Sequence, residues 1–443
     1  MCDSGRARAT HVCQPVWRYP DAIFKTTPRN SYPMPSVSLD SERFRRRFDT
    51  FNKIGATERG GVNRPSLSDE NKAARDTLVE WFREAGLEVR IDAMGNIFGR
   101  RDGTEGDATP VLFGSHIDSQ YNGGRYDGVI GVLGGLEVIE AFNDAGVTTE
   151  RPLEVVAWSN EEGVRFQPDM LGSGVYCDIF DLNYAYERED KEGRRFGDEL
   201  ERIGYKGDVP CETDDIHCYF EMHVEQGPFL EQQDIPVAAV EGVFGFSWLN
   251  VTFEGQANHA GPTPMDMRHD AFVATADVTR AVRRITATEG TDLVGTVGSV
   301  DVWPNAINVI PETVEFTLDF RSYDDAVVDA AVEQIREGVA HAAEREGLEY
   351  EIEEIMRVDA DPFDQDCIDT VVEAAETVGC EYTRLVSGAG HDANYLNKIA
   401  PTSMIFVPSV DGISHRESEF TEWDDIVTGT EVLLNAVQEK AAE

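Results

Sequence analysis

The sequence predicts an α/β protein with a mixed sheet flanked by helices and a second, smaller domain inserted into it. Three observations lead to this prediction. Short apolar runs alternate with helical runs up to about residue 245, a different rhythm occupies residues 246–357, and the first rhythm then resumes. Strands that alternate with helices are typical of a sheet that is at least partly parallel. At 443 residues the chain also exceeds the size at which one core usually keeps growing, so we expect two domains.

The first predicted helix begins near Ser66, which has capping-box spacing to Asp69. An amphipathic run follows through Trp81 and Phe82, and Gly86 suits the C-terminal end of the helix. Further along, we expect strands at 87–92, 96–100, 110–116 and 152–160, and a helix at 128–146.

Between residues 246 and 357 the order of elements is self-contained. It runs strand 246–255, helix 266–285, strands 293–303 and 313–321, helix 324–344 and strand 350–358. This β-α-β-β-α-β order is the ferredoxin-like one. A helix near 367–379, a strand at 402–409 and a closing helix from about 422 then belong to the first pattern again.

These changes of pattern give the expected domain boundaries. Residues 34–245 and 358–443 form the larger domain, and residues 246–357 form the inserted one. Residues 1–33 carry five basic and two acidic residues without periodicity, unlike the acidic chain that follows, and we interpret them as a disordered extension.

Charge excludes several classes of partner. The chain has 83 acidic and 39 basic residues, a formal net charge of −44, and only seven of the basic residues are lysine. Such a surface repels nucleic-acid phosphates and anionic lipid, so neither is expected as a partner. Hydrated carboxylates that are screened by concentrated salt are typical of a halophilic protein. The alternative is an acidic enzyme that works at ordinary ionic strength.

The seven cysteines include no C-x-x-C pair and are odd in number, so neither a disulfide framework nor a thiolate zinc site is indicated. The chain has no apolar run of membrane-spanning length and no signal-peptide pattern at its N-terminus. We therefore expect a cytoplasmic protein.

Metal-ligating residue types follow the four buried-strand candidates of the larger domain. The strand at 110–116 ends at His116, the one at 152–160 is followed by Glu161 and Glu162, the run CYFEMHVEQG contains His223, and the last strand is followed by His415. Ligands of α/β sheets bind beyond the carboxyl ends of the strands, where the loops converge. The sequence therefore predicts a site at that edge.

Imidazole and carboxylate together suit catalytic zinc or manganese, and one carboxylate can bridge two ions. We assign His116, Asp127 and His223 to one ion, and Asp127, Glu162 and His415 to the other. Asp118 is placed to orient His116, and Glu161 is the candidate general base. Each of these residues alone has an ordinary structural interpretation, such as a packing histidine or a turn aspartate. Their agreement at four strand ends favours the metal site.

A series of longer motifs runs in order from about residue 40 to the C-terminus: GSHIDS, GGRYDGVIGVLGGLEV, WSNEEGVRF, EMHVEQGP, QANHAGPTPM, NAINVIP, LDFRS, SGAGHDA and GISHRESE. With these motifs the chain resembles the hydantoinase/carbamoylase amidohydrolases. That group contains N-carbamoyl-L-amino-acid hydrolase, allantoate amidohydrolase and β-ureidopropionase, and belongs to the aminoacylase-like co-catalytic metallopeptidases. Related peptidases usually have Asp or Glu at the position of His223, which favours the carbamoylase branch.

The resemblance implies further roles. By position, Gln226, His259, Asn308 and Arg321 would contact substrate, with Arg321 binding its carboxylate and His259 polarising the scissile carbonyl. The loop around Gly390 would lie beside the substrate. An arginine fork suits a carboxylate, although Arg321 taken alone is equally well explained by a structural salt bridge, and Gln226 by a surface amide.

The family implies hydrolysis of the carbamoyl C–N bond of an N-carbamoyl amino acid or allantoate, by metal-activated water with Glu161 as the base. It also implies a metallopeptidase-type catalytic domain with two divalent ions per subunit (zinc, manganese, cobalt or nickel). The inserted domain would serve as a lid and form a homodimer in which His259 reaches the partner's site. The alternatives are a dipeptidase or N-acyl-amino-acid hydrolase on the same fold, or a non-catalytic metal-binding homologue.

Overall fold

The computed structural model of the chain describes residues 37–212, 215–287 and 292–443. The expectation for residues 1–33 lies outside these ranges. The described residues form two compact units: a small unit, Gly245–Ala360, and a large unit made of residues 37–244 and Asp361–Glu443. Each unit has its own hydrophobic core.

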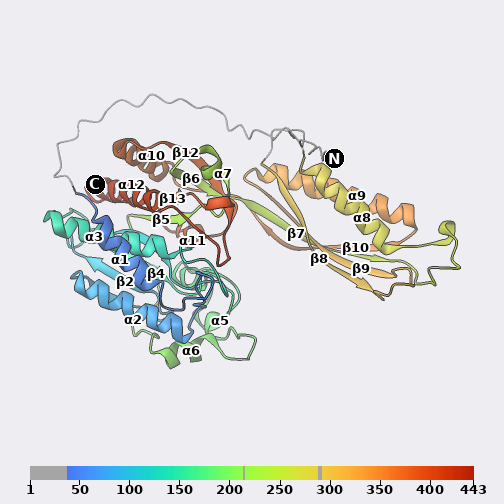
Figure 1. The fold of residues 1–443 in the computed structure, drawn as a ribbon, viewed down its shortest axis with the longest axis horizontal. Helices are drawn as coiled ribbons and strands as arrows, with labels where there is room; N and C mark the ends of the chain where they lie inside the picture. The colour runs from blue at the N-terminus through green and yellow to red at the C-terminus, as the bar shows by residue number, and fades with distance from the viewer. Residues whose placement is uncertain (1–36, 213–214, 288–291) are drawn as a thin grey trace, which may run out of the picture. The chain divides into compact units, whose positions relative to one another are not determined.

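A nine-stranded mixed sheet runs through the large unit (Figure 1). Its central strands β4, β3, β5 and β13 are neighbours in that order and mutually parallel, whereas β2 and β6 flank them antiparallel. The strands are β1 Glu88–Ile91, β2 Ile97–Arg101, β3 Val111–His116, β4 Leu153–Trp158, β5 Cys218–Val224, β6 Val237–Val243, β11 Asp361–Pro362, β12 Tyr382–Ser387 and β13 Thr402–Val407. All four central strands are fully buried, as the apolar runs predict.

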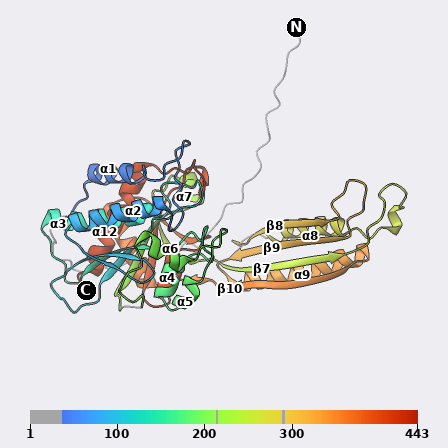
Figure 2. The same cartoon turned by 90° about the horizontal axis from the view of Figure 1, so that it is seen from below.

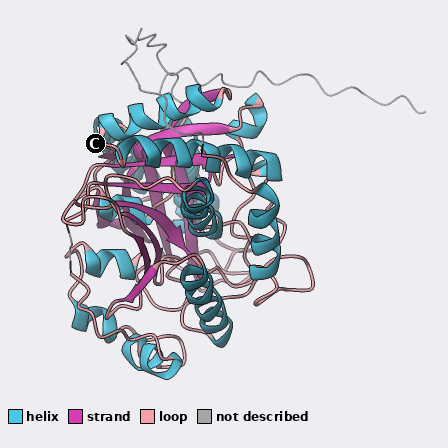
Figure 3. Ribbon diagram, turned by 90° about the vertical axis from the view of Figure 1, so that its left-hand side faces the viewer, coloured by secondary structure: helices cyan, strands magenta, loops and turns pink. Residues whose placement is uncertain are grey.

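Helices cover this sheet, and Figure 3 shows them around the magenta strands. The helices are α1 Ser41–Phe51, α2 Asp69–Glu84, α3 Val129–Ala145, α4 Leu171–Tyr176, α5 Leu182–Tyr186, α6 Phe196–Ile203, α7 Phe229–Gln233, α10 Gln365–Val378, α11 Asp392–Leu396 and α12 Trp423–Lys440. Side chains of β5 alternate between the two faces. Met222 packs against Gly134 of α3 and Thr430 of α12, whereas the neighbouring Glu221 accepts a hydrogen bond from Ala393 of α11. The predicted mixed α/β fold is therefore confirmed.

The start of α2 corrects one detail of the sequence analysis. The N-cap is Ser68, whose side chain accepts a hydrogen bond from the N–H of Asn71, and not Ser66. Ser68 has extended backbone and lies directly before the helix, so its hydroxyl reaches a free N–H of the first turn. Gly86 follows the end of the helix with φ of +80°, as its place in the pattern predicts.

The small unit consists of one four-stranded antiparallel sheet with two long helices, which Figure 2 shows from the side. Its elements are β7 Gly245–Glu254, α8 Ala271–Ile285, β8 Val294–Trp303, β9 Thr313–Ser322, α9 Asp325–Glu346 and β10 Glu349–Val358. Their order along the chain is β-α-β-β-α-β, and the spatial order is β10-β7-β9-β8. Alternate residues of β7, such as Leu249 and Val251, are buried in one core with α8 and α9.

In the described part of the chain, no helix is both long enough and apolar enough to cross a membrane.

Candidate active site

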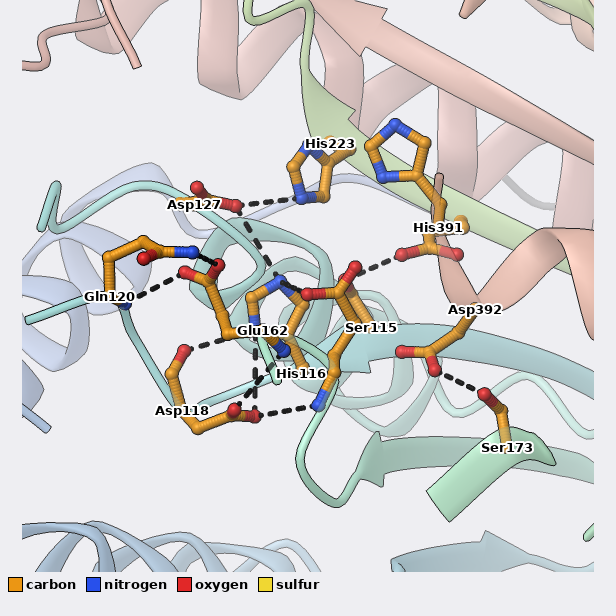
Figure 4. A network of polar contacts seen from close by, with 12 residues as sticks. Ser115, His116, Asp118, Gln120, Asp127, Glu162, Ser173, His223, His391 and Asp392 are labelled. Carbon is orange, nitrogen blue, oxygen red and sulfur yellow. Dashed lines mark hydrogen bonds and ion pairs between the residues drawn. The ribbon is translucent and has the colours of Figure 1, made fainter. Parts of the chain in front are cut away.

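The carboxyl ends of the four central strands bring the predicted ligands together. His116 is the last residue of β3, Glu161 and Glu162 follow β4, His223 lies near the end of β5, and His415 follows β13. Asp127 comes from the loop between β3 and α3. Figure 4 shows this carboxylate between the rings of His116 and His223.

The first cluster contains His116, Asp127 and His223, all of them buried. Oδ1 of Asp127 lies 3.5 Å from Nε2 of His116 and 3.0 Å from Nε2 of His223. In each ring the other nitrogen, Nδ1, faces a main-chain oxygen: that of Asp118 at 3.0 Å and that of Val224 at 2.9 Å. A neutral ring that donates through Nδ1 to this oxygen has its lone pair on Nε2, so in the neutral state both Nε2 atoms can ligate a cation in the cluster.

This arrangement fits a divalent cation. Within the described residues, Nε2 of His116 and Nε2 of His223 are buried without a hydrogen-bond partner. Buried polar atoms are rarely left unpaired, because desolvation costs free energy that no bond then offsets. Two imidazole nitrogens and a carboxylate converging on one point form a donor set that zinc and manganese accept. These residues therefore satisfy the chemistry of a metal site.

The second cluster contains Asp127, Glu162 and His415. Nε2 of His415 lies 3.4 Å from Oδ2 of Asp127 and 3.6 Å from Oε2 of Glu162. Asp127 thus turns one oxygen to each cluster, which is the geometry that a bridging carboxylate needs. The amide of Gln226 also lies here, with Nε2 at 3.3 Å from both Oδ2 of Asp127 and Nε2 of His415.

Asp118 acts differently from the sequence-based expectation. Its main-chain oxygen, not its carboxylate, is the nearer partner of the His116 ring, since Oδ1 lies 3.8 Å from Nδ1. The carboxylate instead accepts hydrogen bonds from the N–H groups of Glu161 and Glu162, both at 3.3 Å. Asp118 therefore holds the turn that carries the candidate base and a ligand.

Glu161 lies beside the first cluster, where Oε2 is 3.4 Å from Nε2 of His116. Burial raises the pKa of its carboxyl well above the usual range, and the charges of Asp392 and Glu162 add to this effect although His116 opposes it. A carboxyl with a raised pKa is a better proton acceptor at neutral pH once its charged form is populated. A nearby divalent cation would favour that charged form.

The charged groups of the first cluster shift one another's pKa values. Burial alone would lower the pKa of His116, but the carboxylates of Glu161, Asp127 and Asp118 outweigh it and raise that pKa well above its usual value. The pKa of His223 is raised too, because Asp127 outweighs the effect of burial. The two imidazoles in turn hold the pKa of Asp127 well below its usual range, against the opposing effect of burial.

Gly128 provides the room for the His116 ring. It has φ of +66°, and a Cβ built on it would lie 2.4 Å from Nε2 of His116. Both the left-handed backbone and the close approach require glycine. This residue explains how Asp127 turns back towards the strand end before α3 begins.

A third group of ligand-type side chains, Glu221, His223 and His391, also lies close together. The carboxylate of Glu221 already accepts hydrogen bonds from the hydroxyl of Ser115 at 2.7 Å and from the N–H of Ala393 at 2.9 Å. His223 has one nitrogen to offer and it faces the first cluster. We therefore assign no additional ion to this group.

Sequence reasoning gave no individual role to His391 and Asp392, which are both buried. The His391 ring lies 4.5 Å from the ring of His223, and Asp392 accepts a hydrogen bond from Ser173. Burial raises the pKa of Asp392 well above its usual range. His391 and Asp392 follow β12. A strand predicted at residues 382–387 would have identified them as candidates, because ligands of α/β sheets bind beyond the carboxyl ends of the strands.

Two other residues hold ligands in place and carried no sequence signal. Gln120 donates to Glu162 through its main-chain N–H at 2.9 Å and its side-chain amide at 2.5 Å. Glu419 is buried and accepts hydrogen bonds from the N–H groups of Tyr126 and Asp127. Burial, with the charge of Asp127, raises the pKa of Glu419 to about 7.

The residues expected to contact substrate divide between the units. Gln226 and the exposed Gly390 belong to the large unit, whereas His259, Asn308 and Arg321 belong to the small one. His259 and Asn308 are brought together there, because residues 258–260 pair with 308–310 through main-chain bonds. Both side chains are exposed.

Arg321 lies on β9 and is the half-buried partner of Asp319, with Nη2 and Oδ2 at 3.0 Å. Its guanidinium also lies over the Phe246 ring, 5.4 Å from the centroid. Arg321 thus makes the structural salt bridge that is one interpretation of this residue. Its planar guanidinium also has the shape that binds a carboxylate, which is the role that the resemblance implies.

Comparison with known proteins gives a consistent answer. Residues 112–439 match the family described as peptidase family M20/M25/M40. An N-carbamoyl-L-amino-acid amidohydrolase from Rhizobium meliloti is 44% identical over 389 residues, which cover 88% of this chain and 94% of the relative. A ureidoglycolate hydrolase from Oryza sativa subsp. japonica is 33% identical, covering 90% of this chain and 84% of that one.

Among solved structures, an amidase of the hydantoinase/carbamoylase family from Burkholderia multivorans superposes with a TM-score of 0.89 at 49% identity. The match covers 92% of this chain and all of that one. This chain therefore belongs to peptidase family M20/M25/M40 and, within it, to the hydantoinase/carbamoylase amidohydrolases.

Proposed function

We propose that this amidohydrolase cleaves the carbamoyl C–N bond of an N-carbamoyl amino acid or of allantoate. One observation carries the proposal: two three-residue ligand clusters share Asp127, and Glu161 lies beside them. The names of the relatives support the substrate class. A candidate base next to open metal positions is an arrangement for hydrolysis, and a purely structural metal site has no use for it.

We further propose that each chain holds two divalent cations, drawn from zinc, manganese, cobalt and nickel. His116, Asp127 and His223 would hold one, and Asp127, Glu162 and His415 the other. When bound, such ions supply Lewis acidity, which acidifies water and stabilises negative charge on oxygen. The unpartnered imidazole nitrogens support the first position most directly.

Glu161 would accept and deliver protons through its Oε atoms. It accepts a proton from the attacking water and later delivers it to the nitrogen that leaves, so that an amine and a carbamate form. The carbamate then breaks down to ammonia and carbon dioxide. Asp118 supports this role, because its carboxylate holds the N–H groups of Glu161 and Glu162.

Recognition of the substrate would come from the small unit. Arg321 has the planar guanidinium that suits a carboxylate, and His259 and Asn308 are both exposed on two backbone segments that pair with each other. A histidine donor suits the developing oxyanion. Since these residues and the ligand clusters belong to different units, we propose that the small unit closes as a lid over the large one, with hinges near Gly245 and Arg357.

We also propose a homodimer formed through the small unit. Within the described residues β8 pairs with β9 along one side only, which leaves an edge for another strand. Met265 in the segment after His259, Trp303 at the end of β8 and Ile307 beside Asn308 are exposed to 76%, 64% and 105% of their full area. Such exposed apolar side chains, on the same unit as the open sheet edge, support an interface there.

A substrate panel tests the function. Ammonia release would be measured with N-carbamoyl-L-amino acids, N-carbamoyl-β-alanine, allantoate and ureidoglycolate, each with manganese, zinc, cobalt or nickel. We expect ammonia from at least one of these substrates. Hydrolysis of dipeptides or N-acyl amino acids without ammonia from any ureido compound would reject the proposal in favour of the peptidase or acylase alternative.

A further inference from the structure

The two ligand clusters differ in how firmly their histidines are held. The side chains of His116 and His223 are 0% and 1% exposed, whereas that of His415 is 51% exposed. His415 also has φ of +57°, a backbone conformation that is uncommon for residues other than glycine. Its loop, between β13 and α12, must therefore supply the constraint that burial supplies for the other two.

Glu419 connects this loop to the ligand that both clusters share. The side chain is buried, with 4% exposure, and it faces two segments at once. Oε2 accepts a hydrogen bond from the hydroxyl of Ser414 at 2.7 Å, and Oε1 accepts from the N–H groups of Tyr126 and Asp127 at 3.2 Å each. One carboxylate thus links the neighbour of His415 to the backbone of Asp127.

The fit around Glu419 is close. A Cβ built on Gly124 would lie 2.0 Å from Oε1 of Glu419, so only glycine leaves space for the carboxylate there. A Cβ on Gly61 would lie 2.7 Å from Cα of Glu417 in the same loop. The segment 414–419 is therefore packed against backbone, which limits how far it can shift.

We propose that Glu419 is a positioning residue for the second, more exposed cation position. Glu419 fixes the loop of His415 against Asp127 and so holds in place the histidine that burial does not hold. Loss of Glu419 would weaken cation binding at this second position and leave binding at the buried position unchanged. The inference rests on the proposed two-cation centre. Partners that orient metal ligands are typically worth about 10- to 100-fold in metal affinity.

Manganese titration of the ion-free, full-length protein tests this inference, with free Mn²⁺ counted by electron paramagnetic resonance. We expect the wild type to bind two ions. Glu419→Ala should bind the first with unchanged affinity and the second about 10- to 100-fold more weakly. The affinity of Glu419→Gln for the second ion should lie between those of the wild type and Glu419→Ala, because the amide oxygen still accepts hydrogen bonds from the N–H groups of Tyr126 and Asp127. Ser414→Ala, which removes one bond to Glu419, should weaken the second ion too.

Glu137→Ala is the matched control. Glu137 is another buried glutamate, and it accepts hydrogen bonds from the N–H of Asp40 and from Arg43 on the outer side of α3. Its loss should lower the melting temperature without changing either manganese affinity.

The possible outcomes separate this inference from the proposed function. Two ions bound with wild-type affinities by both Glu419→Ala and Ser414→Ala would overturn the positioning role. Equal weakening of both ions would overturn it as well, because the effect would then be general. If Glu419→Ala does not fold, the affinities of Glu419→Gln and Ser414→Ala for the second ion test the positioning role instead. A wild type that binds fewer than two ions would instead refute the two-cation centre itself.

Discussion

Nδ1 of His116 faces the main-chain oxygen of Asp118 at 3.0 Å, and the Asp118 carboxylate turns away to hold the N–H groups of Glu161 and Glu162. We therefore predict that Asp118→Asn leaves metal binding intact but lowers turnover. The amide has one acceptor oxygen, so one of the two N–H groups loses its partner. A decrease in kcat of about tenfold, equivalent to about 1.4 kcal/mol, is expected.

Metal content and kcat, measured on the same preparation, test this prediction. Loss of the first ion in Asp118→Asn would show that the carboxylate orients His116 after all.

Replacing the candidate base should separate binding from chemistry. Glu161→Gln preserves size and removes the proton acceptor, so we expect both ions to remain and kcat to fall by about 10²- to 10⁴-fold. Glu162→Gln is the contrasting variant, because it should lose affinity for the second ion. Turnover of Glu161→Gln within about tenfold of wild type would reject Glu161 as the base.

Metal binding should release protons at neutral pH. Against the effect of burial, the carboxylates around His116 raise its pKa well above the usual value in the ion-free protein, which favours the charged ring, and a charged ring must lose a proton before it can ligate. Affinity should therefore increase with pH until the raised pKa is passed. The stabilising effect of the charged ring on the ion-free fold is lost over the same range as pH rises.

Calorimetry of manganese binding at one pH in two buffers of different ionisation enthalpy gives the number of protons released. A value of zero for the first ion would mean that His116 is already neutral or is not a ligand.

The net charge of −44 predicts dependence on salt. Unscreened carboxylates repel one another at low ionic strength, so the melting temperature should increase as potassium chloride is raised from about 0.1 M into the molar range. Sucrose at matched osmolality is the control, since it does not screen charge. A melting temperature that stays flat across this range would exclude the halophilic interpretation.

A shared site in a homodimer predicts complementation. His259→Ala and Glu161→Gln are each expected to be inactive, but exchange of subunits between them would make one complete site in each mixed dimer. Each mixed dimer should recover about half of the activity of a normal dimer, because one of its two sites is complete. Each variant exchanged with itself is the control. Proven exchange without recovery would place His259 in the site of its own subunit.

The sequence predicts the central strands, and the meeting of the candidate ligands at one edge of the sheet, for a physical reason. Parallel buried strands share one carboxyl edge whatever their order, so residues that follow them, such as His116 and His415, are expected to meet although they are far apart in the chain. The structure does bring them together around Asp127.

The supporting contacts of the site could not be predicted in this way. Gln120, Glu221 and Glu419 act through hydrogen bonds to segments distant in sequence, and no spacing rule describes such pairs. Ser66 and Ser68 are the same residue type two positions apart, and only the backbone conformation decides which of them caps α2.

The attachment of the small unit has a consequence for how this protein could be rebuilt. Val243 and Asp361 are direct neighbours across the antiparallel pair β6–β11, and a Cβ on Gly245 would lie 2.5 Å from the nitrogen of Ala360. The chain thus leaves and returns at one point, as it does at the tip of a hairpin. A two-residue Asn-Gly turn has the geometry to join such strands. The whole segment between them can then be exchanged as one piece. If the small unit recognises substrate as proposed, a grafted segment should change substrate choice and leave the candidate ligands of the large unit unchanged.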